Sequence, residues 1–262
     1  MKRGAESGTL GRTQPSTQAR EMNDDGFETI DIEEPRAAPN GSRTLSEQAY
    51  ETLRRDIIRG DLKPGSKLQS EMLKARYGFG GSTLREALTR LSAQMLVTFE
   101  GQRGFRVAEV SKADFADLSE MRKMVEIEAL KRSIKAGDDD WEAGVVAAFH
   151  RLSKIEQEFP DKFGALYDEW EIRNRAFHDA LISACNSRWL LRMHELLFQQ
   201  SERYRRITYS SGTVIPRNVN EEHRRIMEAA IARDVDAACG LAASHIQKTV
   251  SVLDAFYGRQ KS

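Results

Sequence analysis

The sequence is poor in cysteine and contains no long hydrophobic run. Only two cysteines, Cys185 and Cys239, occur among 262 residues, which is too few for a disulfide framework or a cysteine-based zinc site. No apolar stretch approaches the roughly 20 residues that cross a bilayer, and the N-terminus lacks the apolar core of a signal peptide. We therefore expect a soluble protein of the reducing cytoplasm with no membrane partner.

The chain also lacks a net charge, since 40 Lys and Arg residues balance 40 Asp and Glu residues. The net charge therefore says nothing about binding partners, but the distribution of charge along the chain does. Residues 44–110 contain 11 basic and 8 acidic residues, whereas the segments on either side carry a slight acidic excess. A basic segment within a neutral chain is a weak indication of nucleic-acid binding.

Composition divides the chain into four parts. Residues 1–43 are rich in Gly, Ser, Thr, Pro and charged residues, which predicts a disordered N-terminal tail. Residues 44–110 combine short helical and strand patterns, residues 111–257 are helical throughout, and residues 258–262 form a short second tail. We expect a mainly α-helical protein with a small N-terminal domain and an all-α C-terminal domain.

The N-terminal domain has the pattern of three helices followed by a β-hairpin. Thr44 and Glu47 have the spacing of a capping box at the start of the first helix, and a second helix is expected over 70–77. Two β-prone runs, 96–100 and 105–110, surround a glycine-bounded tip, which is typical of a hairpin. This order of elements predicts a winged helix-turn-helix over 44–110.

The third helix of this domain is the candidate DNA-reading element. It follows a glycine pair at 80–81, and either Ser82 or Thr83 can cap it. Thr83 and Arg85 lie off its buried face, and Arg103 stands at the hairpin tip. An ordinary amphipathic helix with solvated arginines explains the helix taken alone better. The hairpin that follows it favours a DNA-binding function for these four residues.

Six helices with short connections are expected in the C-terminal domain, which predicts an antiparallel bundle. Their expected ranges are 112–135, 139–158, 161–185, 187–208, 217–232 and 234–257.

Three of the five histidines fall within the apolar stripes of three different bundle helices. They are His178, His223 and His245, and Asn174 precedes His178 by one helical turn. A single buried histidine is usually a hydrogen-bonded core residue. Three together, each needing a partner, favour a shared divalent ion such as zinc, nickel or cobalt. The two interpretations remain open at equal weight.

Other polar residues of the bundle have less specific patterns. His150 and His194 are assigned structural roles, and the charged run 202–206 is interpreted as a solvated helix end. Arg122 lies on a largely apolar helix, where it could bind a ligand carboxylate. Alternatively, it is a partly exposed arginine whose stem covers the core.

Two groups of motifs resemble a known family of regulators. The Gly-Asp-Leu-Lys-Pro-Gly, Leu-Arg-Glu-Ala-Leu and Gly101–Val107 stretches resemble the DNA-binding domain of GntR-type bacterial transcription regulators. Phe177-His178, Asn186, Glu222-His223 and His245 resemble their FCD effector domain. Within that branch, Asp168-Glu-Trp-Glu-Ile-Arg and Arg203-Tyr-Arg resemble the repressors of carbon starvation and of lysine-to-glutarate catabolism.

The resemblance implies roles for individual residues. DNA contacts would fall on Ser82, Thr83, Arg85 and Arg103; metal ligands on Asn174, His178, His223 and His245; and effector contacts on Arg122, Asn186 and Tyr204. The chain departs from the family at two of its positions. Gly81 replaces a usual arginine, and Asn174 replaces a usual aspartate, so that it offers a carbonyl oxygen without charge.

We interpret the sequence as a ligand-responsive transcriptional regulator, most simply a repressor, and not an enzyme. It would bind double-stranded operator DNA as a homodimer and respond to a small organic acid, for example a dicarboxylate such as glutarate. A bound divalent metal, zinc or nickel, would help to hold the acid. The alternatives are a metal-dependent hydrolytic or lyase-type enzyme with an appended DNA-binding domain, and a ligand sensor without metal.

Overall fold

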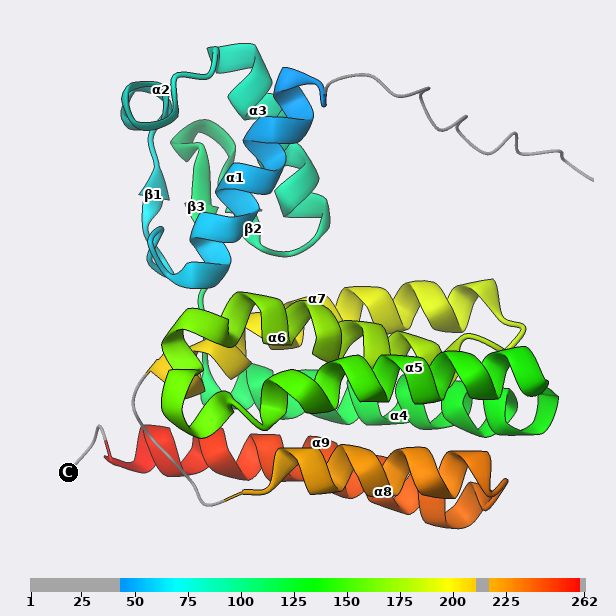
Figure 1. The fold of residues 1–262 in the computed structure, drawn as a ribbon. Coiled ribbons are helices and arrows are strands. Elements are labelled where there is room, and N and C mark those ends of the chain that lie inside the picture. The colour runs from blue at the N-terminus through cyan, green and yellow to red at the C-terminus, as the bar shows by residue number, and fades with distance from the viewer. Residues whose placement is uncertain (1–42, 211–216, 260–262) are drawn as a thin grey trace, which may run out of the picture. The chain divides into compact units, whose positions relative to one another are not determined.

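The computed structural model describes residues 43–210 and 217–259 (Figure 1). The predicted tail over 1–43 lies outside this part of the chain except for Arg43. Of the predicted tail over 258–262, residues 258 and 259 belong to the last helix, and the others lie outside the described part. The N-terminal elements are α1 (Leu45–Arg59), β1 (Lys67–Leu68), α2 (Ser70–Tyr77), α3 (Gly81–Ala93), β2 (Val97–Phe99), a 3-10 turn (Gly101–Arg103) and β3 (Phe105–Val107).

The N-terminal elements form the predicted winged helix-turn-helix. Helix α1 begins where the capping box places it, because the backbone N–H of Glu47 donates to the Thr44 hydroxyl at 3.1 Å. Strands β2 and β3 pair antiparallel, with Val97 opposite Val107. Strand β1, which was not predicted, pairs with the other edge of β3 and gives the order β1-β3-β2.

The start of α3 differs from the prediction. The helix begins at Gly81 with Gly80 as its N-cap, and no side chain caps it. The prediction that Ser82 or Thr83 caps the helix is therefore wrong, because both residues already lie inside its first turn. Their hydroxyl groups are not used for capping and remain at the end of the helix that would meet DNA.

The C-terminal elements form the predicted helical bundle. They are α4 (Lys112–Ala136), α5 (Asp139–Glu156), α6 (Phe159–Ile182), α7 (Arg188–Ser210), α8 (Val219–Ile231) and α9 (Val235–Arg259). Helix α4 packs against α7 and α9, while α5 packs against α6 and α8. Short turns at Asn186 and Arg233, both with positive φ, reverse the chain between neighbouring helices. The axes of the six helices run nearly side by side (Figure 1).

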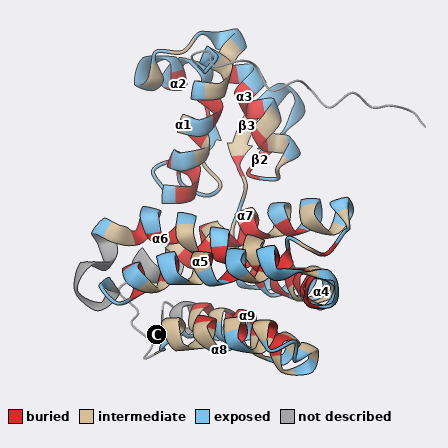
Figure 2. Ribbon diagram, turned by 45° about the vertical axis from the view of Figure 1, so that its right-hand side comes forward, coloured by how far each residue is buried: buried red, intermediate tan, exposed pale blue. Residues whose placement is uncertain are grey.

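Buried residues line the inner faces of these helices, and exposed residues cover the outer faces (Figure 2). The largest apolar cluster includes Trp141, Trp170, Phe177 and Ile226. Several polar side chains are buried among them, and these build the site described below. No helix within the described ranges is long and apolar enough to cross a membrane.

Candidate functional site

Three histidines from three helices meet inside the bundle. His178 of α6, His223 of α8 and His245 of α9 are buried, with 2%, 0% and 7% of their surface exposed. Each offers a ligating atom, and these atoms lie within 4.8 Å of one another. The ring centroids of His223 and His245 are 4.6 Å apart. The prediction that the three residues point into the core from different helices is therefore confirmed.

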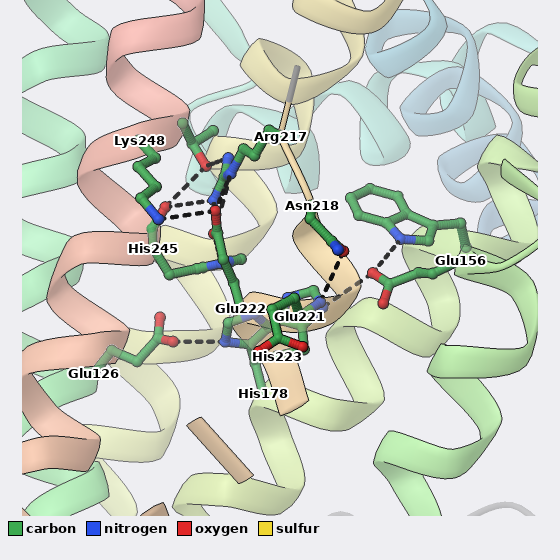
Figure 3. A network of polar contacts seen from close by, with 12 residues as sticks. Glu126, Glu156, His178, Arg217, Asn218, Glu221, Glu222, His223, His245 and Lys248 are labelled. Carbon is green, nitrogen blue, oxygen red and sulfur yellow. Dashed lines mark hydrogen bonds and ion pairs between the residues drawn. The ribbon is translucent and has the colours of Figure 1, made fainter. Parts of the chain in front are cut away.

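A glutamate holds the Nδ1 atom of each histidine (Figure 3). The distances to Nδ1 are 2.6 Å for Glu126 and His178, 3.0 Å for Glu156 and His223, and 2.9 Å for Glu222 and His245. Nδ1 of His245 also lies 3.1 Å from Nη2 of Arg217, which can only donate, so a donor and an acceptor both face that atom. A carboxylate accepts a hydrogen bond from a ring N–H, so in the neutral imidazoles of His178 and His223 the glutamate places the proton on Nδ1. The Nε2 atom is then left with its lone pair.

The Nε2 atoms of His178 and His223 are buried and have no hydrogen-bond partner among the described residues. An unsatisfied buried nitrogen costs free energy, which a bound ion would offset. Metal-ligating histidines usually donate their other ring N–H to a carboxylate or carbonyl, an arrangement that fits His178 with Glu126 and His223 with Glu156. The residues therefore fit a divalent ion such as zinc or nickel, which imidazole nitrogen binds well.

Burial favours the neutral form of His178 and His245, which is the form that binds metal. It lowers the pKa of His178 to about 4, although the neighbouring Glu126 opposes the shift. Burial also lowers the pKa of His245 well below its ordinary value, against the opposing effect of Glu222. Burial alone would raise the pKa of Glu126, but Arg122 and His178 outweigh it and hold that pKa well below its usual range.

Asn174 lies one turn before His178 on α6 and is 3% exposed. Its side chain makes no hydrogen bond within the part of the chain that the structure describes. Its carbonyl oxygen is therefore available as a neutral ligand beside His178, as the resemblance implies.

Arg122 of α4 is 5% exposed, so the alternative of a partly exposed arginine is wrong. Its Nε donates to Oε2 of Glu126 at 2.9 Å. Its guanidinium carbon lies 4.4 Å from the centre of the Phe198 ring, a cation–π contact. Burial lowers the pKa of Arg122, and Glu126 opposes this shift. Arg122 is thus a buried cation that Glu126 links to His178 of the cluster.

The structure gives other roles to two predicted effector contacts. The hydroxyl of Tyr204 donates to Asp114, and its ring stacks on Phe115 with centroids 4.6 Å apart. Asn186 is exposed at the turn between α6 and α7, where its φ of 51° is one that asparagine tolerates. Neither makes a hydrogen bond to the histidines among the described residues.

The interpretation of 202–206 as a solvated helix end is wrong. Arg203 and Arg205 are each 4% exposed. Arg205 pairs with Glu171 of α6, with 3.2 Å between Nε and Oε2. Helical periodicity could not reveal this, because the acid that neutralises Arg205 lies on another helix.

The remaining two histidines also differ from one another. His194 is 1% exposed, and neither of its ring nitrogens has a hydrogen-bond partner among the described residues. Its Nδ1 lies 3.7 Å from Oε2 of Glu126. His150 is exposed. Thus His194 belongs to the polar interior, whereas His150 does not.

The three glutamates are the functional candidates that the sequence analysis missed. Glu126 follows Arg122 by four residues, a spacing that indicates an ion pair on one helix face. Glu222 directly precedes His223, yet it contacts His245. Glu156 is the last residue of α5 and carries no local signal. Only the packing of the helices shows which histidine each glutamate contacts.

The second candidate surface is formed by α3 and the wing. Ser82, Arg85 and Arg103 are exposed, and Thr83 is half-buried. Arg85 lines a hollow of about 630 Å³ between α3 and the wing, together with Gly81, Phe99, Gly101 and Gln102. A helix end with free hydroxyl and guanidinium groups beside a wing is the geometry that enters a DNA major groove.

A winged helix-turn-helix and a helical bundle with a buried histidine cluster, in one chain, define a DNA-binding transcription regulator. Residues 45–107 match the family model "Bacterial regulatory proteins, gntR family", and residues 117–248 match the FCD domain model. The chain belongs to the GntR family of bacterial regulators and carries an FCD domain.

Similar proteins agree with this assignment. The chain is 44% identical over 214 residues to the uncharacterized HTH-type transcriptional regulator BphR of Paraburkholderia xenovorans (strain LB400), covering 82% of this chain and 87% of BphR. It is 37% identical over 208 residues to the HTH-type transcriptional repressor GlaR of Escherichia coli (strain K12), covering 78% and 93%. E. coli McbR/YncC has the same fold, with a TM-score of 0.66 at 21% identity over 82% of this chain and all of that one.

Proposed function

We propose that this regulator is a repressor that a small carboxylate releases from its operator. The observation that carries the proposal is the histidine cluster, in which each Nδ1 is bound by a glutamate and the Nε2 atoms of His178 and His223 have no partner in the described chain. Protein interiors rarely leave buried nitrogen atoms without a partner, so these two Nε2 atoms favour a bound ligand that they contact. The name of GlaR, a repressor, supports the direction of control.

In this proposal His178, His223 and His245 hold a divalent metal, zinc or nickel, with the Asn174 carbonyl oxygen as a further ligand. When bound, the metal supplies a positive charge that attracts one carboxylate oxygen of the effector. Arg122 supplies a second charge, and its guanidinium is buried, so competition from water is weak. Together these groups favour an acid, and a dicarboxylate such as glutarate can use both.

At the DNA, two chains would present two winged domains to the half-sites of a palindromic operator. Arg85 would read a base edge in the major groove, while Ser82, Thr83 and Arg103 would contact the backbone or the minor groove. An effector shifts the equilibrium only if it binds the DNA-released state more tightly than the DNA-bound state. The bundle is where that difference would arise.

An enzyme is the second candidate, because a metal on three histidines can activate water. Such a reaction needs a general base near the metal. The three glutamates closest to the histidines are each engaged with an Nδ1 atom, so they orient ligands rather than accept protons from water. A sensor is therefore favoured.

Two measurements on one purified sample test the proposal. Metal analysis should find about one zinc or nickel per chain, and glutarate or another C4 to C6 diacid should raise the melting temperature and release promoter DNA. Arg122→Ala should abolish the thermal shift. Absence of metal from both the wild type and Asn174→Asp would refute the metal centre. A metal-loaded protein that responds to none of the acids would refute the effector class.

A further inference from the structure

The two carboxylate oxygens of Glu126 contact two different functional groups. Oε1 lies 2.6 Å from Nδ1 of His178, and Oε2 accepts a hydrogen bond from Nε of Arg122 at 2.9 Å. The arginine is the proposed carboxylate contact and the histidine is a proposed metal ligand. One side chain of α4 therefore joins the two halves of the proposed effector site.

The other two glutamates do not link a histidine to Arg122. Glu156 also accepts hydrogen bonds from the neutral groups of Trp170 and Asn220. Glu222 is bound by Arg217 and Lys248 at the edge of the bundle. Only Glu126 among the three links a histidine of the cluster to the buried arginine.

The surroundings of Glu126 allow one contact to affect the other. Glu126, Arg122 and His178 are at most 5% exposed, and in such a dry environment linked hydrogen bonds polarise one another. Phe198 holds the guanidinium of Arg122 by a cation–π contact. On the other side, Nδ1 of His194 lies 3.7 Å from Oε2 of Glu126 and has no hydrogen-bond partner among the described residues. The carboxylate thus has a second neighbour toward which it can shift.

We propose that Glu126 is a positioning residue that couples a carboxylate at Arg122 to a metal at His178. Glu126 keeps the His178 proton on Nδ1, so that Nε2 can donate its lone pair. A ligand carboxylate that takes over part of the Arg122 charge weakens the hold of Arg122 on Oε2. Glu126 then accepts more strongly from the Nδ1–H group, and Nε2 becomes a better donor.

This inference rests on the proposed function, because it requires a metal at the histidines. It adds that effector and metal raise each other's affinity through the protein, besides any direct bond between them. Such coupling is reciprocal, so a loaded metal also improves the binding of the acid at Arg122.

A double-mutant cycle tests the coupling with zinc as the only probe. Zinc affinity is measured by competition with a chromophoric chelator for the wild type, Arg122→Met, Glu126→Gln and the double variant. If Arg122 and Glu126 act on the zinc only through space, the effects of the two substitutions on the free energy of zinc binding add. If they act through their shared contact, the two effects do not add. The cycle compares the factor by which Arg122→Met tightens zinc binding in two backgrounds. We expect this factor to be at least about three-fold larger when residue 126 is Glu than when it is Gln.

The matched control is the same cycle with Glu156→Gln, which changes an equivalent glutamate that does not touch Arg122. That cycle should be additive within about two-fold. An equally additive Glu126 cycle would overturn the coupling while leaving the metal centre intact. A wild-type protein that binds no zinc would overturn both the metal centre and the coupling.

A measurement on the zinc-free wild type avoids the risk that a variant fails to fold. Long-range ¹H–¹⁵N correlation spectra distinguish the two neutral tautomers of a histidine. His178 should carry its proton on Nδ1, with that proton shifted far downfield by the Glu126 carboxylate. A His178 proton on Nε2 would overturn the inference.

Discussion

The hydroxyl of Tyr77 donates a hydrogen bond to Oδ2 of Asp56 over 2.6 Å. This contact joins the end of α2 to α1 in the winged domain, and Arg76 reaches the same carboxylate at 3.1 Å. Asp56 is 7% exposed, and Arg55 also lies 3.5 Å from its Oδ1, so these three partners stabilise its negative charge. Burial raises the pKa of Tyr77 well above its ordinary value of 10.0, and the hydrogen bond to Asp56 adds to the shift.

The first prediction concerns the alkaline stability of the winged domain. Because the phenol pKa is higher in the folded than in the unfolded chain, its contribution is complete below about pH 10 and declines as the pH rises above that value. Tyr77→Phe should lower the free energy of unfolding at pH 7 by about 0.5–1.5 kcal/mol. The variant should also lose less stability than the wild type between pH 10 and 11.5. Urea unfolding at several pH values checks this, and parallel curves for the two proteins would contradict it.

The second prediction concerns base reading by Arg85. Arg85→Ala should weaken operator binding by about 1–3 kcal/mol and reduce discrimination at one base pair of each half-site. Titration of operator variants by fluorescence anisotropy measures both effects. Arg132, an exposed arginine of α4 paired with Glu128, provides a control substitution that should leave DNA binding unchanged. Unaltered binding by Arg85→Ala would remove this residue from the interface.

The third prediction separates backbone contacts from base contacts. Arg103 lies in the exposed 3-10 turn at the wing tip, where a phosphate contact would not depend on base sequence. Arg103→Ala should therefore weaken binding to all duplexes alike and reduce the salt slope of log K by about one. A change confined to one sequence would show that Arg103 reads a base instead.

The fourth prediction concerns the buried pair of Arg205 and Glu171. Removal of one partner leaves an unpaired buried charge, so Arg205→Met should destabilise the bundle by about 3–5 kcal/mol. The double variant with Glu171→Leu should recover most of this loss, because neither charge is then left alone. Guanidinium unfolding curves measure both variants. The guanidinium carbon of Arg205 also lies 4.4 Å from the centre of the Phe198 ring, and no recovery in the double variant would show that Arg205 contributes mainly through this packing.

The fifth prediction tests how the glutamates support metal binding. Glu156→Gln should reduce zinc affinity by roughly 10–100-fold, because His223 loses the carboxylate that fixes its ring. Glu128→Gln on the exposed face of α4 provides the control and should have no effect. Equal affinities for the two variants would exclude orientation of His223 by Glu156.

The sequence was sufficient for the order of the helices and the hairpin, because the signals of helix ends are local. Thr44 and Ser111 cap their helices through side-chain bonds to backbone groups three residues away. The same local pattern was misleading at Ser82 and Thr83, because Gly80 serves as the cap without any side chain. Strand β1 has only two residues, which is too short to show alternation.

For a related reason, the sequence predicted the histidines of the site but not their partners. Helical periodicity places His178, His223 and His245 on inward faces, but it cannot tell which residue of a neighbouring helix each one meets. The pairing of His223 with Glu156 spans 67 residues, and that of Arg205 with Glu171 spans 34. These contacts depend on how far one helix is shifted along another, which no local pattern encodes.

In the proposed metal centre, the three histidine–glutamate pairs would also determine when a metal can load. They join α6 to α4, α8 to α5, and α9 to α8, so no imidazole is oriented until its partner helix has docked. An unfolded chain offers the same histidines without fixed tautomers and at large separations, and it therefore holds a metal only weakly. Under this proposal, metal capture would report completed folding, and each loaded molecule would be one whose bundle has already assembled.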